Sequence, residues 1–266
     1  MIRKIVKHKI THGQHIKQTT AEKELLYLLF FCLLLLFARM ALTKTITYLF
    51  LAWNLFLAYL PYLFAQLFRY FQFNYKSKLI SGSIFLLWLL FVPNAFYILT
   101  DLFHLELSNS GIAKWFDLAL IFSFAWMGLL LGIISLNSMM RILEKKVSSK
   151  TQWFVLYTIM FLNALGVYIG RFLRFNSWDI LTNPFRLTGE IFYLCIHPFR
   201  NFYEWAMIAC FAILMTLIYK SITSIGYVFW RETLQKSRWQ NRILSSCYIF
   251  LFGVFLRGNS LKIINN

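Results

Sequence analysis

The stretch that decides the fold is WFDLALIFSFAWMGLLLGIISL, residues 115–136. Asp117 is its single charged residue. A helix needs roughly 20 mostly apolar residues to cross the hydrocarbon core of a bilayer. Because backbone polar groups within lipid must be satisfied inside the segment, this stretch is predicted to be a transmembrane helix.

The chain as a whole has the same apolar character. Of its 266 residues, 59% are hydrophobic, 20% aromatic and 14% charged, with a mean hydropathy of +0.61. A soluble domain has about 25% charged residues. Here there is too little polar surface to cover the apolar side chains. The composition therefore excludes a water-soluble fold.

Six segments are long and apolar enough to span a membrane. They are residues 25–42, 46–68, 79–99, 115–136, 153–173 and 205–224. Apolar and polar residues do not alternate along them, which argues against a β-barrel. We predict an all-α polytopic bundle of transmembrane helices.

Residues outside these segments complete the expected organisation. Residues 1–24 form a basic tail, 25–224 the transmembrane helical domain, and 225–266 a basic connection with a C-terminal hydrophobic segment. Within the last part, residues 243–256 are short for a span and typical of an interfacial piece, so they are a candidate for a seventh span. Arg39, at the end of the first span, is expected to extend its side chain to the membrane interface.

The net charge of +17 predicts an orientation and no nucleic-acid partner. The basic residues are scattered between apolar runs, with no nucleic-acid motif beside them. Eighteen Lys and Arg fall in the N-terminal tail and the connections on its side, and seven fall on the opposite side. The positive-inside rule therefore places the N-terminus in the cytoplasm, and the partner of the basic loops is the lipid bilayer.

Acidic residues gather on the predicted outer side. Six of the ten lie there: Asp101, Glu106, Asp117, Asp179, Glu190 and Glu204. The motif TDLFHLE follows the third span, and if its helix continues, Asp101 and His104 share a face. Such a pair could supply acid–base groups or metal ligands. A solvated loop is the alternative, and no metal or cofactor motif occurs in the chain, so we expect neither.

Asp117 has two interpretations that the sequence leaves open. An acid in the first turn of a helix is favoured by the helix dipole. An acid within a span is otherwise a buried functional carboxylate.

The motif GRFLRFNSWD follows the fifth span on the same outer side. Arg171 and Arg174 are three residues apart, which places both on one face if the helix continues, with Trp178 on that face too. A guanidinium pairs with carboxylate or phosphate through two parallel hydrogen bonds. The arginines could therefore bind Asp101, Asp117 or Asp179, or an anionic ligand. Asn176 is a candidate cap where the helix breaks.

Small and polar residues mark the interior of the bundle. Gly128 and Gly132, and likewise Gly166 and Gly170, form GxxxG pairs, which predicts that helices four and five pack closely on each other or on neighbours. Pro93 frees a backbone carbonyl in the third span. With Asn94 beside it, this position either lines a cavity or is a simple kink. Asn54 and Asn163 are expected to form hydrogen bonds between helices.

The motifs VPNAFYILTDLFHLE, WFDLALIFSFAWMGLLLGIISL and YIGRFLRFNSWDILTNPF resemble the DUF1361 family of bacterial multi-pass membrane proteins. The similarity covers roughly residues 48–224. The resemblance implies a bacterial cell-membrane protein of unknown function. The family motif positions coincide with twelve residues of this chain: Pro93, Asn94, Asp101, His104, Trp115, Asp117, Gly170, Arg171, Arg174, Asn176, Trp178 and Asp179. Phe96 and Phe175 depart from the family pattern, where a proline and a tryptophan stand.

These observations lead to one functional hypothesis and two alternatives. The hypothesis is an outer-side site for an anionic, lipid-linked substrate. In it, Arg171, Arg174, Asn176, Trp178 and Asn94 bind the substrate, and Asp101, His104, Asp117 and Asp179 are the candidate catalytic groups. The alternatives are a small-solute transporter or channel, and a membrane scaffold or assembly factor without catalysis. The sequence does not decide whether the chain is an enzyme.

Overall fold

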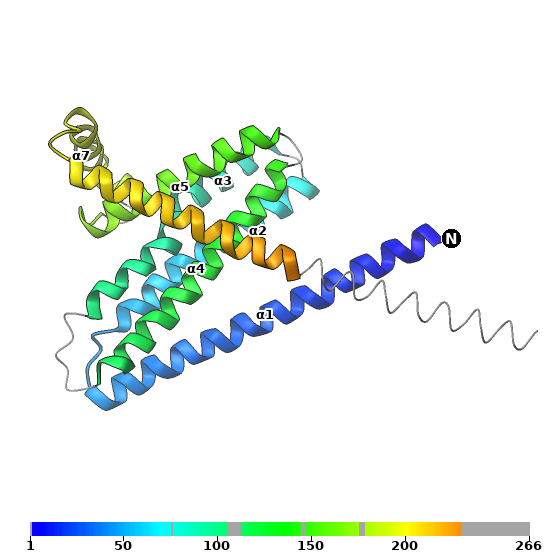
Figure 1. Ribbon diagram of the computed structural model, residues 1–266, viewed down its shortest axis with the longest axis horizontal. Coiled ribbons are helices and arrows are strands. Elements are labelled where there is room, and N and C mark those ends of the chain that lie inside the picture. Colours follow the sequence, from blue (N-terminus) through cyan, green and yellow to red (C-terminus); the bar gives the residue numbers. More distant parts are fainter. Residues whose placement is uncertain (1, 76, 106–112, 145–146, 176–178, 230–266) are drawn as a thin grey trace, which may run out of the picture. The chain divides into compact units, whose positions relative to one another are not determined.

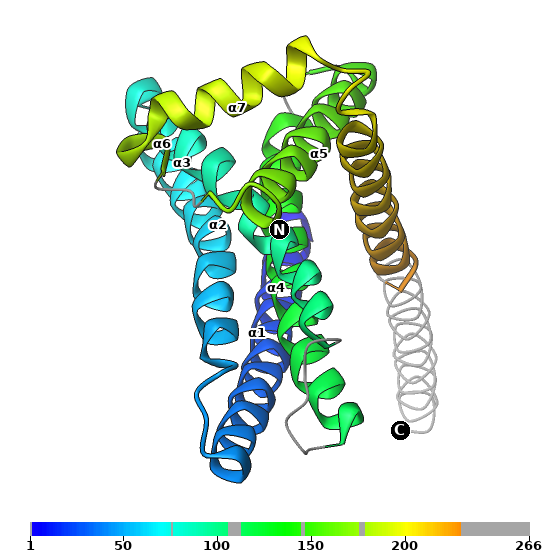
Figure 2. The same ribbon diagram turned by 90° about the vertical axis from the view of Figure 1, so that its left-hand side faces the viewer.

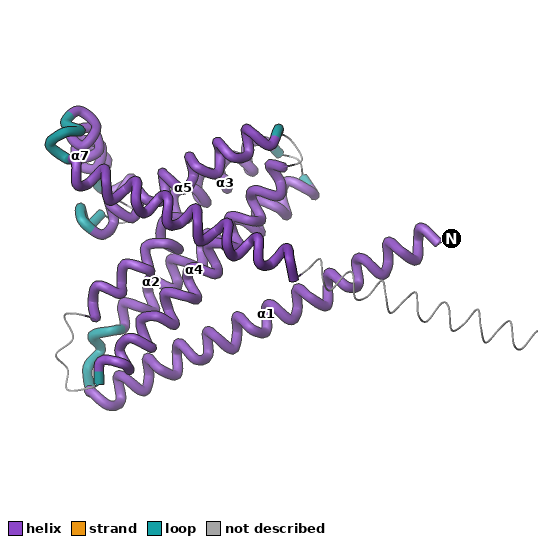
Figure 3. Tube along the Cα trace, viewed as in Figure 1, coloured by secondary structure: helices purple, strands orange, loops and turns teal. Residues whose placement is uncertain are grey.

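The computed structural model describes residues 2–75, 77–105, 113–144, 147–175 and 179–229, and no strand occurs in these ranges (Figure 3). The helices, in order, are α1 (Ile2–Thr43), α2 (Leu49–Asn74), α3 (Lys78–Tyr97), the 3-10 helix η1 (Ile98–Leu105), α4 (Lys114–Glu144), α5 (Ser149–Arg171), α6 (Asp179–Thr182) and α7 (Pro184–Ile196). A helix over Phe202–Phe229 follows. The predicted all-α fold is confirmed.

Six helical segments are long and apolar enough to cross a membrane. They are Glu22–Thr43, Leu49–Asn74, Lys78–Leu105, Lys114–Glu144, Ser149–Arg171 and Phe202–Phe229. The predicted polytopic bundle of six spans is therefore confirmed. The candidate seventh segment, residues 243–256, lies outside the described residues.

The chain divides into two compact units, Met1–Thr216 and Leu217–Asn266. The first unit holds α1 to α7 and the first part of the last long helix. The described part of the second unit, residues 217–229, is helical. All sites described below belong to the first unit.

The helix that contains residues 115–136 is the most buried span of the first unit. In α4, 67% of the apolar window is buried, against 17% in Glu22–Thr43. It packs against α1, α2, α3 and η1, and Figure 1 shows the C-terminal end of α1 beside α4. Leu36 of α1, Leu51 of α2, Ile98 of η1 and Phe124 of α4 share one buried apolar cluster. This cluster holds the four helical elements together.

The glycine pair of α4 receives the end of α3 and the start of η1. A Cβ atom at Gly128 would lie 2.6 Å from the side chain of Ile98, and one at Gly132 would lie 2.9 Å from Cβ of Ala95. Real Cβ contacts are longer than this, so a side chain at either position would force the helices apart. The partner of this pair is α3 rather than α5.

The glycine pair of α5 receives the same helix from its other side. A Cβ atom at Gly166 would lie 2.7 Å from the Pro93 ring, and one at Gly170 would lie 3.3 Å from the Tyr97 ring. The C-terminal half of α3 thus packs closely between the glycine-containing faces of α4 and α5. This close approach brings α5, at its C-terminal end, beside η1.

The helix α7 crosses the direction of the long helices (Figure 2). Pro184 begins it, where a missing backbone N–H costs nothing. Leu187 and Leu194 are buried, whereas Phe185 is 90% exposed. Trp205 donates from Nε1 to the Leu194 carbonyl at 3.1 Å, which ties α7 to the last long helix. One face of α7 therefore covers the bundle and the other is exposed.

Candidate functional site

A buried carboxylate lies where η1, α2 and α5 meet. Asp101 is 1% exposed, and its Oδ2 accepts a 2.8 Å hydrogen bond from Nδ2 of Asn54. Its Oδ1 lies 3.8 Å from Nη1 of Arg171, which is an ion pair beyond hydrogen-bond length. Within the described residues Oδ1 has no hydrogen-bond partner. One oxygen of Asp101 is therefore held by the protein and the other is left for a further donor.

His104 completes this group of side chains from the same 3-10 helix. Nη1 of Arg171 lies 3.1 Å from Nε2 of His104. A guanidinium only donates, so Nε2 is the acceptor and the imidazole is the neutral form with its proton on Nδ1. The His104 ring also lies 4.8 Å from the Phe50 ring, centroid to centroid. Asn54, Asp101, His104 and Arg171 are called the Asp101 cluster below.

The solvated-loop alternative for TDLFHLE is wrong for the described part of that motif. The chain continues from α3 into η1, and in a 3-10 helix residues three apart are eclipsed. Asp101 and His104 consequently present their side chains on one side, toward Arg171. The buried carboxylate is tolerated because an amide and a guanidinium compensate its charge. Glu106 lies outside the described residues.

Asp117 belongs to a second, separate cluster. Its Oδ1 accepts from Nε of Arg39 at 2.5 Å, and its Oδ2 accepts from Nη2 of Arg39 and from the Tyr48 hydroxyl, both at 3.2 Å. Asp117 is fully buried and Arg39 is 2% exposed. Asp117 is thus both in the first turn of α4 and buried. Arg39, Tyr48 and Asp117 are called the Asp117 cluster below.

The expectation that Arg39 reaches the membrane interface is wrong. Its guanidinium turns inward because Asp117 offers a two-pronged acceptor and the Tyr48 ring lies 5.2 Å away. The count of basic residues predicts that Arg39 and the start of α4 lie on the same side of the membrane, which could have suggested the contact between Arg39 and Asp117. The sequence does not show that α1 and α4 are neighbours, so the contact was not predicted.

The two clusters lie at different depths along α2. Tyr48 is the N-cap of α2, and Asn54 is six residues further on, roughly 9 Å along a helix axis. The Asp117 cluster therefore lies at the end of the helix, and the Asp101 cluster lies more than one turn inside it. Ionisable groups within a span are costly and mark functional sites by default.

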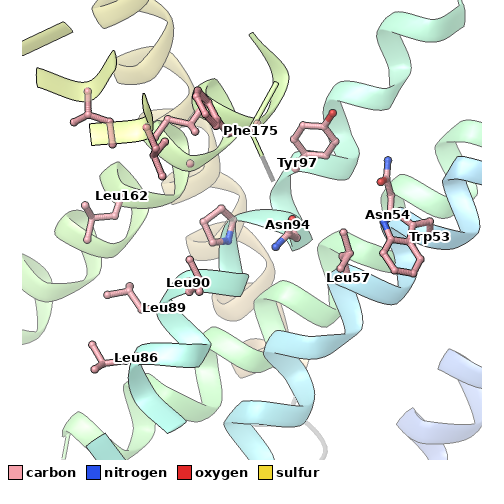
Figure 4. Close-up of a pocket in the computed structure, with 16 residues that line it drawn as sticks. Trp53, Asn54, Leu57, Leu86, Leu89, Leu90, Asn94, Tyr97, Leu162 and Phe175 are labelled. Atoms are coloured by element: carbon pink, nitrogen blue, oxygen red, sulfur yellow. The ribbon is translucent and has the colours of Figure 1, made fainter. Parts of the chain in front are cut away.

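A pocket of about 420 Å³ adjoins the Asp101 cluster (Figure 4). Its walls come from α2, α3, α5, Phe175 and α7, and they include Asn54 and Gly170, the residue before Arg171. Most of the lining is apolar: Trp53, Leu57, Leu86, Leu89, Leu90, Pro93, Leu162, Ile169, Phe175, Leu187 and Ile191. The size is that of ligand-binding pockets, which are about 300–1,000 Å³.

Polar side chains at the pocket are few. Asn94 lies in its wall and donates from Nδ2 to the Phe91 carbonyl at 3.0 Å. Arg186 of α7 lies 5.3 Å from the ring of Phe175, another wall residue. Arg171 and Arg186 do not line the pocket themselves, but each adjoins a residue that does, Gly170 and Phe175 respectively.

The structure does not place Arg171 and Arg174 on one helical face. The helix α5 ends at Arg171, and Arg174 has a positive φ of 59°, so that prediction is wrong. Arg174 is exposed. Asp179 begins α6 and accepts from the Thr182 hydroxyl at 3.0 Å. Asn176 and Trp178 lie outside the described residues.

One buried amide differs from the other asparagines of the spans. Asn163 of α5 is fully buried, and neither its Nδ2 nor its Oδ1 has a hydrogen-bond partner among the described residues. The expected hydrogen bond between helices is seen for Asn54 but not for Asn163. Burying an unpaired amide is unfavourable, so this position carries a cost that packing alone does not explain.

The chemistry available at the Asp101 cluster is recognition and proton exchange. Arg171 keeps a 17% exposed side chain that can donate to an anion, and Asp101 can accept from a hydroxyl. In the described part of the chain, no group of three or more His, Cys, Asp or Glu side chains could hold a metal ion.

Comparison with known proteins gives one family. The model of a family described as "Protein of unknown function (DUF1361)" matches residues 53–218, which is more than half of the chain. The match contains the Asp101 cluster, the pocket and Asp117, whereas Arg39 and Tyr48 precede it. No curated protein matches the chain. No solved structure matches it either.

Proposed function

From the premise that this chain belongs to the DUF1361 family, we propose that this integral membrane protein binds an anionic group at the Asp101 cluster, with Arg171 as the principal donor. We further propose that it lies in a bacterial cell membrane with its N-terminus in the cytoplasm. The cluster is then reached from the outer side.

The observation that supports this most is the loose contact within the cluster. At 3.8 Å, Arg171 and Asp101 attract each other as charges but form no hydrogen bond, so Asp101 Oδ1 can still accept one and the guanidinium can still donate. A ligand that carries phosphate or carboxylate beside a hydroxyl can satisfy both groups at once. The neutral imidazole of His104 keeps Arg171 in place without cancelling its charge.

Mass spectrometry of bound molecules tests the proposal. The full chain is purified as wild type, as the Arg171→Gln/Asp101→Asn double variant, and as Arg200→Gln, which removes an exposed arginine elsewhere. The double variant removes both charges together, so no charge is left buried alone. We expect an anionic molecule to co-purify with wild type and Arg200→Gln and to fall roughly tenfold in the double variant. Equal amounts in all three would reject the proposal.

A scaffold function is the second candidate, and the two ion pairs favour it. The Asp117 cluster links α1 to α4, and the Arg171–Asp101 pair links α5 to η1. On this alternative the charges only hold helices together. It predicts that the swap Arg171→Asp/Asp101→Arg recovers the wild-type melting temperature and that no anion co-purifies with wild type.

Asn163 favours a third candidate, a small-solute transporter or channel. Its unpaired amide lies near the middle of α5 and would contact a polar solute crossing the bundle. This candidate predicts solute flux in proteoliposomes that Asn163→Leu abolishes. If the variant transports as wild type does, Asn163 has no part in a pathway.

A further inference from the structure

The pocket beside the Asp101 cluster extends toward the middle of the membrane. Its wall on α3 runs from Leu86 to Tyr97, a separation of eleven positions or roughly 16 Å of helix. This is about half the thickness of a hydrocarbon core of about 30 Å. Tyr97 is at the end nearest Asp101, four residues away. The pocket therefore begins at the polar cluster and continues to the depth where lipid chains lie.

The deep part of the pocket has no polar group that calls for a polar ligand. Asn54 is bonded to Asp101 and Asn94 to a backbone carbonyl. The remaining wall there is leucine from α3 and α5: Leu86, Leu89, Leu90 and Leu162 (Figure 4). A hydrocarbon chain gains free energy from such a wall without leaving any donor or acceptor unpaired.

The pocket is also accessible from the lipid side. Trp53, Leu86 and Leu162 line it and are 52%, 65% and 38% exposed. All three lie in spans, so in a bilayer this part of the pocket is at the depth of the hydrocarbon core. A chain can enter sideways from the bilayer while its polar end stays at the cluster. A soluble anion has no hydrocarbon chain and would not enter through an opening to the lipid.

We infer that the ligand of this site is an anionic amphiphile whose hydrocarbon chain occupies the pocket and whose phosphate or carboxylate lies at Arg171. The inference rests on the proposed function, because it supplies the tail of the anionic group. Arg186, held against Phe175 in the pocket wall, provides a second cation for the headgroup. The chain supplies affinity and the cluster supplies orientation.

Photo-crosslinking of the full chain in phosphatidylcholine nanodiscs tests the inference. The probe is dodecyl phosphate with a diazirine on its chain, and the competitors are dodecyl phosphate, dodecanol and inorganic phosphate. Leu90→Trp fills the pocket, and Leu87→Trp places the same indole on α3 outside it, where Leu87 is 43% exposed. Leu162→Trp fills the pocket from α5 if Leu90→Trp does not fold.

We expect crosslinks to the pocket walls of α3 and α5, and a roughly tenfold loss in Leu90→Trp but not in Leu87→Trp. Dodecyl phosphate should compete well, and inorganic phosphate hardly at all. Unchanged labelling of Leu90→Trp and Leu162→Trp, or equal competition by inorganic phosphate, overturns the inference.

The neutralised double variant Arg171→Gln/Asp101→Asn separates this inference from the proposed function. If this variant loses labelling while the tryptophan variants keep it, anion binding at Arg171 is supported and binding of the hydrocarbon chain in the pocket is rejected. If it keeps labelling while the tryptophan variants lose it, and dodecanol competes as well as dodecyl phosphate, anion binding at the Asp101 cluster is rejected. The pocket then binds hydrocarbon chains without recognising charge.

Discussion

Asp117 and Arg39 show at the scale of single residues why a charge persists inside this apolar chain. A lone carboxylate buried in α4 would be very costly, and the guanidinium and the Tyr48 hydroxyl compensate it in a two-pronged contact. Such a pair adds little stability relative to apolar side chains of similar volume. What it contributes is register, because α1 can satisfy Asp117 in one position only.

Breaking that pair is expected to destabilise the protein strongly. Asp117→Asn leaves the Arg39 charge buried without a counter-charge, which costs about 3–5 kcal/mol of unfolding free energy. The double variant Arg39→Met/Asp117→Leu should recover most of the loss, because no charge remains. Scanning fluorimetry of the purified protein measures the melting temperature. Glu144→Gln, an exposed acid at the other end of α4, is the matched control. If Asp117→Asn and Glu144→Gln have the same melting temperature, the Arg39–Asp117 pair has no structural role.

Asn163 gives the opposite prediction. Leucine has the same branched shape as asparagine and no polar atoms, so Asn163→Leu removes an unpaired buried amide. We expect stability to rise by about 1–3 kcal/mol, seen as a higher melting temperature. Asn94→Leu is the control and should not stabilise, because it loses the hydrogen bond to Phe91. A lower melting temperature for Asn163→Leu would show that the amide has a partner in the folded protein.

The sequence predicted the residues of the Asp101 cluster but not their arrangement. Asp101, His104 and Arg171 stand out because charge is rare in the chain, whatever the fold. Their contacts with one another depend on α5 ending at Arg171 and on α3 continuing as a 3-10 helix. Neither event has a distinct signal in apolar periodicity, and so the common face of Arg171 and Arg174 was predicted wrongly.

At the scale of elements, α3 is positioned by the glycines on either side of it. The GxxxG pairs were visible in the sequence, and that small residues permit close approach is general. The choice of α3 as the shared partner of α4 and α5 was not visible, since a glycine pair does not identify the helix that fills its groove. The position of α3 matters for function because it forms one wall of the pocket and leads into η1.

A methyl group at Gly166 is expected to disturb this packing. Its Cβ would lie 2.7 Å from two atoms of the rigid Pro93 ring, so Gly166→Ala should cost about 1–3 kcal/mol of stability. Gly82→Ala is the control, because no atom lies within 4 Å of its added Cβ and alanine is the better helix former. Thermal unfolding of both variants measures the difference. Equal melting temperatures would show that α3 and α5 are further apart than described.

At the scale of the whole molecule, composition alone was enough to predict the class of fold. Spans of about 20 apolar residues have no other stable structure in lipid, so the six long helices follow from hydropathy. Their ends follow less well. The third span extends to Leu105 because Asp101 and His104 find partners inside the bundle, which hydropathy does not record.

The orientation in the membrane is the prediction that connects the site to its ligand. Eighteen basic residues against seven predict a cytoplasmic N-terminus, and on that prediction the α1–α2 connection lies outside with the Asp117 cluster just beneath it. Thr45, in that connection, and Ser148, the N-cap of α5, are both exposed. In a cysteine-free version of the chain, Thr45→Cys should react with an impermeant maleimide on intact cells. Ser148→Cys should react only after the membrane is opened. The reverse pattern would place the Asp101 cluster toward the cytoplasm, and the anionic amphiphile would then have to come from the inner leaflet.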